Sequence, residues 1–311
     1  MKGLELSEGF YREYGAPMLR KDFADYEGKI AVGLVGGGSE CFGYDDATSQ
    51  DHDFEPGFCL FLPDDIPDTV AFDLERAYAK LPKEYMGYQR CRFSPVGGSR
   101  HGVKRICDFF AEKTGSPDGC LSTTDWFFTP EQSLAEATNG RIFRDDLGRF
   151  TAIRKGLSYF PSDIRLKKIA GELLLMGQSG QYNYPRLLKR GDTAAAQLAV
   201  GEFVKSAMHV AFLLNQRYMP YYKWCFRALS ELSILSSLYA PLERLLSSGN
   251  TVAEAEEKQG LITEVCSAIA TELSVQRLSR LSGCEMEGQA YEVNDRIKDA
   301  EIRNLHVLYA I

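Results

Sequence analysis

Two polar segments near the N-terminus have residue types and a spacing that suit a nucleotide with its metal ion. Gly38-Ser39 follows an apolar run, and after eleven intervening residues the chain carries Asp51-His52-Asp53. Carboxylates at positions i and i+2 of a strand point to the same face. Their mutual repulsion falls when a divalent cation lies between them. Because oxygen ligands beside phosphates suit Mg²⁺ and also accept Mn²⁺, we expect Asp51 and Asp53 to bind one of these metals.

The glycine-serine turn supplies the second part of this expected site. The apolar run 30–35 predicts a short buried strand that ends at Gly36-Gly37-Gly38-Ser39. Backbone N–H groups and a hydroxyl at such a turn can hold an anion. Strand, turn, loop and paired aspartates together predict a nucleoside-triphosphate site. In it, Gly38 and Ser39 hold the β- and γ-phosphates, and the aspartates hold metal at the α-phosphate.

The elements that must position these residues change in character along the chain. The first half has short apolar runs between breakers, and the second half has long stretches with a period of 3.6 residues, so we expect an α+β fold. We predict a mixed-sheet catalytic domain over residues 1–155 and an α-helical substrate- or acceptor-binding bundle over residues 156–311, with the active site between them. The helices expected are 5–26, 68–80, 162–177, 193–216, 221–247, 251–282 and 289–308, and the strands are 30–35, 58–62 and 103–110.

Three other nucleotide or metal motifs do not fit the glycine and aspartate segments. A dinucleotide-binding turn requires a following helix and a later acidic residue, which the pattern after Gly38 does not indicate. A P-loop requires Gly-Lys-Ser/Thr, which is absent after the glycines. Counted from Asp51, the sixth position is Pro56, where a calcium-binding EF-hand loop needs glycine.

Composition limits the class of protein. The chain has 311 residues, 44% of them hydrophobic, and a formal net charge of -7, which disfavours sequence-independent binding to nucleic acid. The eight cysteines form no CxxC pair, and with four histidines they fit no zinc-finger spacing. No apolar stretch reaches the length of a membrane helix, and the N-terminal residues show no leader pattern, so we expect a cytoplasmic protein.

The pattern Gly38-Ser39 followed by Asp51-His52-Asp53-Phe54 resembles the signature of the nucleotidyltransferase superfamily with the DNA polymerase β-like fold. This superfamily includes the small-molecule adenylyltransferases of aminoglycoside and lincosamide resistance. The resemblance implies a nucleotidyltransferase fold over the first domain. It also implies a third carboxylate on a later strand, which binds metal and orients the acceptor hydroxyl. Asp108 is the candidate, and pairing with Arg105 or Lys104 at the end of a strand is the alternative.

A second resemblance extends over nearly the whole chain. It is carried by four segments: Gly36–Asp46, Ser49–Asp53, Asn183–Arg186 and Leu214–Trp224. Through these segments the sequence is similar to the family named domain of unknown function 4037. That family resembles nucleotidyltransferases at its N-terminus and has a helical C-terminal region.

Polar and aromatic residues of the second half are further candidates. Lys223 and Arg217 can reach triphosphate oxygens while the Tyr222 ring stacks on the base. Alternatively, the aromatic residues of the segment 218–224 seal the interface between the domains. A polar loop between two helices offers side chains that contact the acceptor or cap helices: Gln181, Asn183, Tyr184 and Arg186. We expect His101 in an exposed loop and His209 as a hydrogen-bonded core residue.

The reaction expected from these residues is transfer of a nucleoside monophosphate from a nucleoside triphosphate, with ATP as first choice, to a hydroxyl acceptor, with release of pyrophosphate. Metal ions stabilise the attacking and leaving oxygens of such a displacement. Lys223 would offset the charge that develops on pyrophosphate. A small molecule is the first choice of acceptor, a protein the second and an RNA end the third. The alternative class is a non-catalytic nucleotide-binding, regulatory or interaction module.

Overall fold

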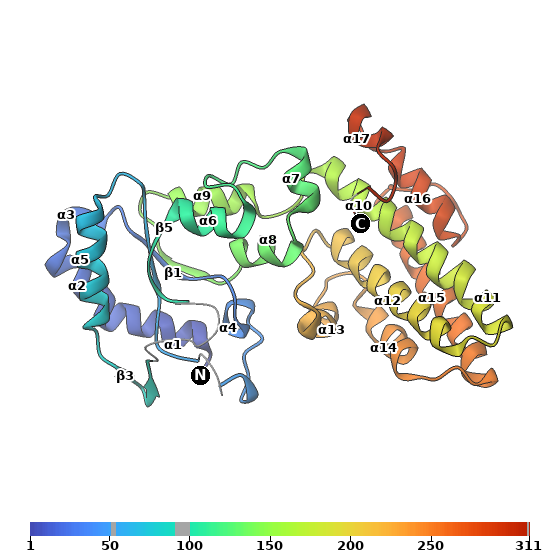
Figure 1. Ribbon diagram of the computed structural model, residues 1–311, viewed down its shortest axis with the longest axis horizontal. Helices are drawn as coiled ribbons and strands as arrows, with labels where there is room; N and C mark the ends of the chain where they lie inside the picture. Colours follow the sequence, from blue (N-terminus) through green and yellow to red (C-terminus); the bar gives the residue numbers. More distant parts are fainter. Residues whose placement is uncertain (51–53, 91–99, 310) are drawn as a thin grey trace. The chain divides into compact units, whose positions relative to one another are not determined.

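The structure is a computed structural model that describes residues 1–50, 54–90, 100–309 and 311. It contains a mixed four-stranded sheet with helices around it and a helical C-terminal region, which confirms the α+β class (Figure 1). The chain divides into two compact units. Unit 1 comprises Met1–Asp125 and Thr129–Ser158, and unit 2 comprises Trp126–Phe128 and Tyr159–Ile311.

The sheet of unit 1 has the strand order β5-β2-β1-β6. Strand β1 runs antiparallel to both of its neighbours, β2 and β6, whereas β2 and β5 are parallel. Val32 of β1 lies opposite Leu60 of β2. All residues of β1 and β2 are buried, so the two central strands form the middle of this unit. The strands are β1 (Ala31–Leu34), β2 (Cys59–Leu62), β5 (Gly102–Arg105), β6 (Arg141–Arg144) and the separate hairpin β3 (Glu84–Tyr85) and β4 (Tyr88–Gln89).

Helices cover both faces of the sheet because side chains of β2 alternate between them. Phe58, Leu60 and Leu62 pack with the N-terminal helices and α5 (Asp68–Ala79). Phe61 points the other way, and its ring lies 4.2 Å from that of Phe150 on α9 (Arg149–Gly156). The other helical segments of this unit are α1 (Gly3–Phe10), η1 (Tyr11–Gly15), α2 (Ala16–Asp22), α3 (Ala24–Glu27), α4 (Ser39–Phe42), η2 (Thr48–Gln50), α6 (Ile106–Thr114), α7 (Thr123–Phe128, shared with unit 2) and α8 (Glu131–Thr138).

Unit 2 is helical throughout its described regular structure. Helix α10 packs against α12 and α16, and α12 also contacts α11, α14 and α15 (Figure 1). Helix α12 is the one described helix long and apolar enough to cross a membrane, but 61% of its apolar window is buried, as in a core helix. The helical segments are α10 (Ser162–Met176), η3 (Gly177–Asn183), α11 (Tyr184–Lys189), α12 (Thr193–Leu214), α13 (Tyr222–Ser230), η4 (Ser236–Leu238), α14 (Tyr239–Ser247), α15 (Val252–Val275), α16 (Met286–Asn294) and α17 (Ala300–Asn304).

Several predicted elements need correction. The strand expected over 103–110 ends at Arg105, and Ile106–Thr114 is helix α6. Ile106, Phe109 and Phe110 are buried together because positions i, i+3 and i+4 share a helix face. The helix predicted over 5–26 is one helical run to Asp22 with a π-helical turn inside it, followed by the short α3.

The long helices predicted near the C-terminus are also interrupted. The stretch 221–247 forms α13 and α14, separated at Leu235, whose φ is +62°. Pro241 lies in the first turn of α14, where backbone N–H groups have no acceptor within the helix, so proline costs no hydrogen bond there. The helix expected to reach 282 ends at Val275, and the stretch 289–308 forms the end of α16 and the short α17.

Candidate functional site

The turn Gly36–Ser39, called the glycine turn below, follows the carboxyl end of the buried strand β1, as the sequence predicts. Gly36 has a φ of +104° and Gly38 a φ of +121°, a region that residues with a side chain rarely adopt. Ser39 follows as the first residue of the one-turn helix α4. This helix was not predicted, so the expectation that no helix follows the turn was wrong. The exclusion of a dinucleotide-binding fold itself holds because β1 is antiparallel to both neighbours.

The amide side chain of Asn139 fixes the start of the turn. Asn139 Oδ1 accepts a hydrogen bond of 2.8 Å from Gly36 N, and Asn139 Nδ2 donates one of 2.8 Å to Gly36 O. The next residue, Gly140, donates its N–H to Cys41 O in α4. Arg154 in turn donates to the carbonyls of Thr138 and Asn139. The end of α8 and the glycine turn are therefore joined by a continuous set of hydrogen bonds.

A guanidinium group lies against the turn. Arg100 Nη2 donates to Gly37 O at 2.5 Å and forms an ion pair with Glu40 Oε1. A Cβ atom added to Gly38 would overlap this guanidinium, so the turn and Arg100 are in close contact. The Arg100 side chain is 24% exposed and that of Glu40 only 7% exposed. The pair is thus largely shielded from water, which strengthens the attraction between its charges.

A lysine and two glutamates lie on another side of the turn. Lys113 Nζ lies 2.8 Å from Glu136 Oε2 and 3.0 Å from Glu112 Oε1. Burial opposes the charge of Lys113, but these two carboxylates outweigh it and raise the pKa of Lys113. Glu136 Oε1 lies 3.8 Å from the position that a Cβ of Gly37 would take. Arg100 and Lys113 are therefore each paired with glutamate.

Two buried groups near the turn are held neutral or paired. Burial raises the pKa of the Cys41 thiol well above its usual value, so this residue of α4 stays protonated near neutral pH. His101, expected in an exposed loop, is only 8% exposed, and His101 Nδ1 lies 2.9 Å from Glu55 Oε1. His101 lies in a loop just before β5, as predicted, but the expected exposure was wrong because its ring packs against the backbone of Gly57.

The aspartates predicted to bind the metal, Asp51 and Asp53, lie outside the described residues, as does His52. Their roles and the Mg²⁺ or Mn²⁺ site stay predictions. Among the residues that the structure does describe, no group of three or more His, Cys, Asp or Glu side chains is arranged to hold a metal ion.

The third carboxylate candidate, Asp108, lies in the first turn of α6 and not on a strand. Its side chain is exposed and lines a pocket of about 490 Å³ between α5, β5 and α6, together with Lys104 and Glu112. Arg105 instead pairs with Asp68. The strand position expected for Asp108 is therefore wrong, whereas its proposed metal role is untested.

In unit 2, the predicted phosphate and base ligands lie around the start of α13. Arg217, Tyr222 and Lys223 are exposed, and Tyr222 is exposed to 75%. Lys223 Nζ lies 4.5 Å from the centre of the Trp224 ring. The Tyr222 ring lies 4.2 Å from that of Tyr221. These groups are available to a ligand of this unit, and their assignment to a nucleotide stays a prediction.

The segment predicted as a polar loop, residues 181–186, is helical. It spans the end of η3 and the start of α11, because Gly180 lets the chain pack directly on the Phe203 ring of α12. Gln181 bonds Cys284 O and Met286 N, while the buried Tyr184 donates its hydroxyl to Asn250. Asn183 and Arg186 are exposed, and Arg186 stacks on Tyr182.

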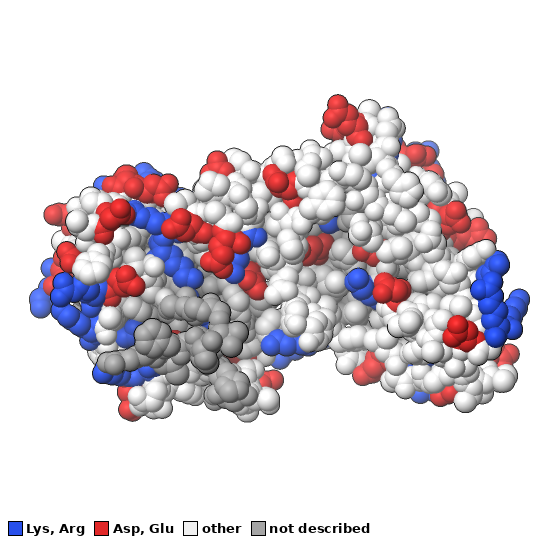
Figure 2. All heavy atoms as spheres, in the orientation of Figure 1, with Lys and Arg blue, Asp and Glu red and all other residues white. Residues whose placement is uncertain are grey.

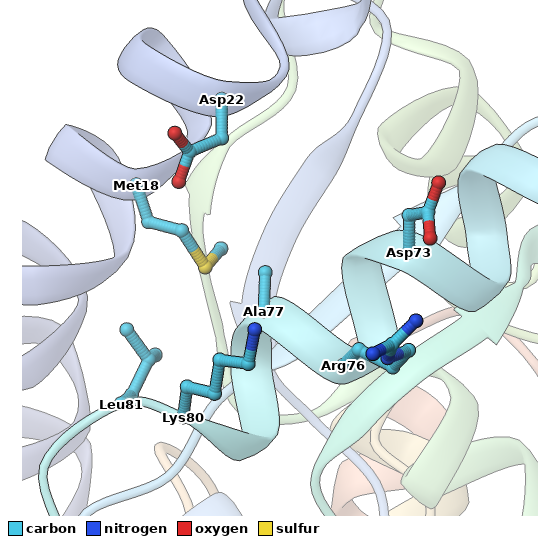
Figure 3. A pocket seen from close by; sticks show the side chains of 7 residues that line it. All are labelled: Met18, Asp22, Asp73, Arg76, Ala77, Lys80 and Leu81. Carbon is cyan, nitrogen blue, oxygen red and sulfur yellow. The ribbon is translucent and has the colours of Figure 1, made fainter.

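Unit 1 has a further pocket of about 420 Å³ between α2 and α5 (Figure 3). Met18 and Asp22 come from α2, and Asp73 and Arg76 come from α5. Its charged groups are of both signs, and none of the predicted site residues that the structure describes lines it. We therefore place the candidate site at the glycine turn.

Sequence reasoning found Gly38 and Ser39 but missed the side chains that surround them. Arg100 and Glu40 are 60 residues apart, and Asn139 is 103 residues from Gly36. One local signal was available, because Asn139-Gly140 is a turn-forming pair.

Comparison with known proteins bears on the second half of the chain. Comparison with curated proteins and with solved structures found no match. A family model matches from α7 into α13, a range that contains Asn139 and Lys223 but not Gly38. Residues 126–225 match the family described as domain of unknown function (DUF4037), and the predicted family resemblance is thereby confirmed over these residues.

Proposed function

We propose that this chain is a metal-dependent nucleotidyltransferase. It moves a nucleoside monophosphate from a nucleoside triphosphate, ATP as first choice, to the hydroxyl of an acceptor and releases pyrophosphate. The observation that carries the proposal is the turn at the end of β1. Gly36 and Gly38 there adopt backbone conformations that favour glycine, and the Asp51-His52-Asp53 segment follows at the spacing of the superfamily signature.

Each part of the proposed site has a separate chemical task. Gly38 and Ser39 bind the terminal phosphates through backbone N–H groups and the hydroxyl. Asp51 and Asp53 would hold Mg²⁺ or Mn²⁺, which neutralises charge on the phosphates. Asp108 remains the candidate third carboxylate. The mixed sheet, with its turn at the end of a buried central strand, is compatible with the polymerase β-like fold that the proposal includes.

A small hydroxylated molecule is the acceptor that the charge favours. The net charge is -7, and in the view of Figure 2 basic and acidic side chains are interspersed over the described surface of unit 1. A broad basic face is what binding to nucleic acid would need. Lys223, Arg217 and Tyr222 are proposed to contact the nucleotide. Asn183 and Arg186 are the exposed members of the group proposed for the acceptor, and Gln181 and Tyr184 would support them.

Pyrophosphate release in a mixture of candidate acceptors tests the proposal. The expected result is metal-dependent release that falls roughly a thousand-fold or more in Asp51→Asn and Asp53→Asn, because several kcal/mol of charge stabilisation are lost. The exposed Asp25 of α3 provides a matched control, and Asp25→Asn should keep the full rate. The melting temperature without metal should stay nearly unchanged in all three variants.

The same assay separates an enzyme from a binding module. Triphosphate binding without pyrophosphate release from any acceptor would favour the non-catalytic alternative. Wild-type turnover in Asp51→Asn or Asp53→Asn would refute the metal assignment.

A further inference from the structure

We propose that Arg100 is a phosphate ligand of the nucleoside triphosphate, and that Glu40 holds its guanidinium at the glycine turn until phosphate replaces the carboxylate. This inference rests on the proposed function, because it takes the turn as the place where the triphosphate binds. It adds a residue that neither resemblance assigns, together with a contact that regulates access to the site.

The position of Arg100 is the first argument. Its Nη2 atom donates to Gly37 O at 2.5 Å, and the guanidinium lies where a side chain on Gly38 would overlap it. The cation is therefore in direct contact with the backbone that is proposed to receive the terminal phosphates. The guanidinium fork matches the geometry of phosphate and of carboxylate equally well.

The partner of Arg100 is the second argument. Glu40 is the second residue of α4, and its carboxylate is 7% exposed. Glu40 Oε1 accepts from the same Nη2 atom that binds Gly37 O. An anionic oxygen therefore already lies on this guanidinium at the turn. A phosphate oxygen could take that position while the bond from Arg100 to Gly37 O keeps the guanidinium in place.

This exchange predicts effects of opposite sign for the two partners. Loss of the Arg100 cation removes a charged hydrogen bond to phosphate and weakens binding. Loss of the Glu40 charge removes the competing anion and its repulsion of the phosphates, and binding tightens. An ion pair with only a structural role predicts that both changes destabilise the turn and that neither tightens binding.

Calorimetric titration of the full chain with Mg·ATP, and separately with Mg²⁺ and inorganic tripolyphosphate, tests the exchange. Arg100→Ala should weaken binding of both probes about ten-fold or more, the effect of losing one charged hydrogen bond. Arg100→Lys keeps the cation without the fork and should fall between Arg100→Ala and the wild type. Glu40→Gln should tighten binding about three-fold or more, which corresponds to the removal of one nearby like charge.

Arg144 and Glu27 form a matched control pair in the same unit. Arg144 Nη1 lies 2.5 Å from Glu27 Oε1, and their side chains are 22% and 17% exposed, against 24% and 7% for Arg100 and Glu40. Arg144 lies opposite Val32, before the end of β1 from which the turn leaves. Arg144→Ala and Glu27→Gln should leave the affinity for both probes unchanged. Circular dichroism of every variant checks that it folds.

Each contrary result has a distinct meaning. If the wild type binds Mg·ATP but Arg100→Ala and Arg100→Lys bind it equally well, Arg100 is not a phosphate ligand and only this inference fails. If Glu40→Gln weakens binding as Arg100→Ala does, the pair is structural and the exchange is refuted. A loss for Mg·ATP without a loss for tripolyphosphate would place Arg100 away from the phosphates. If the wild type binds neither probe, the proposed function fails together with the inference.

Discussion

At the residue scale, the backbone of Gly38 links folding of the turn to binding at it. Gly38 has φ +121° and ψ 148°, a conformation that is almost restricted to glycine. Gly38→Ala should lower the free energy of unfolding by about 1–3 kcal/mol, the cost of one such strained residue. It should also weaken Mg·ATP binding at least as much as Arg100→Ala does, because the added methyl group displaces the Arg100 guanidinium. Urea denaturation and calorimetry measure the two effects.

The neighbouring Gly37 provides the control for this prediction. Gly37 is not among the glycines with positive φ, and the nearest atom to an added Cβ is Glu136 Oε1 at 3.8 Å, an ordinary contact. Gly37→Ala should therefore change the free energy of unfolding by no more than about 0.5 kcal/mol. Equal losses in Gly37→Ala and Gly38→Ala would show that glycine is needed throughout the turn for another reason.

The part of the site that sequence could predict is the part made of neighbouring residues. Gly38 and Ser39 follow an apolar run directly, so local pattern is sufficient to find them. The contacts of Arg100 and Asn139 with the turn depend on the pairing of β5 with β2 and of β6 with β1 in the folded sheet. No local spacing encodes such contacts. For the same reason the pairing of Glu40 with a cation could not be read from the chain.

At the element scale, the fold was predictable where periodicity and breakers agree. Helices α5, α10 and α12 lie within two residues of their predicted bounds because each has a clear apolar period between breakers. A strand was predicted over 103–110 because Val103 to Phe110 is rich in β-branched and aromatic residues, which favour strands. The prediction failed after Arg105 because the buried positions there have helical spacing. The loop predicted after residue 177 is helical because the glycines of 177–183 allow close packing and do not break the helix.

A contact between Glu172 of α10 and His209 of α12 gives a prediction on how these two elements hold together. His209 Nδ1 lies 2.7 Å from Glu172 Oε1, which confirms the expected hydrogen-bonded core histidine. Burial opposes ionisation of Glu172, but His209 and Ser206 outweigh it, so the pKa of Glu172 lies below its usual 4.5. Glu172→Gln should lower the free energy of unfolding at pH 7 by about 3 kcal/mol, because one partner of a buried pair is lost. Urea denaturation measures the change.

The pH dependence of that change identifies its cause. A carboxyl group whose pKa is depressed by folding stabilises the native state fully above its unfolded pKa, and this stabilisation is lost as pH falls through the folded pKa. The difference between wild type and Glu172→Gln should therefore shrink as the pH is taken below about 4.5. Glu202→Gln, at an exposed position of α12, should behave as wild type. A difference that persists unchanged at acid pH would assign the loss to packing.

At the scale of the whole molecule, the division into two units determines what each spectroscopic probe reports. The chain has two tryptophans, Trp126 and Trp224, and both belong to unit 2. Tryptophan fluorescence therefore reports unfolding of unit 2 and does not report unfolding of the sheet in unit 1. Buried cysteines supply a probe for each unit, since Cys59 lies in β2 and Cys266 in α15. Burial raises the pKa of Cys59 to about 11 and that of Cys266 to about 12, so each thiol stays protonated and shielded while its unit is folded.

We predict that the two units unfold in separate transitions, which these probes can distinguish, because each unit has its own buried apolar core. In urea, Glu172→Gln should shift the fluorescence transition and the maleimide labelling of Cys266 to lower concentration while labelling of Cys59 keeps its wild-type midpoint. Gly38→Ala should shift the labelling of Cys59 to lower urea concentration, while the fluorescence transition and the labelling of Cys266 keep their wild-type midpoints. Peptide mass spectrometry after pulse labelling reads both cysteines in one sample, so differences between preparations cannot mimic the result. A shift of all signals together in both variants would mean that the chain unfolds as one cooperative unit. Loss of binding in Gly38→Ala would then have to be separated from global destabilisation by titration well below the denaturation midpoint.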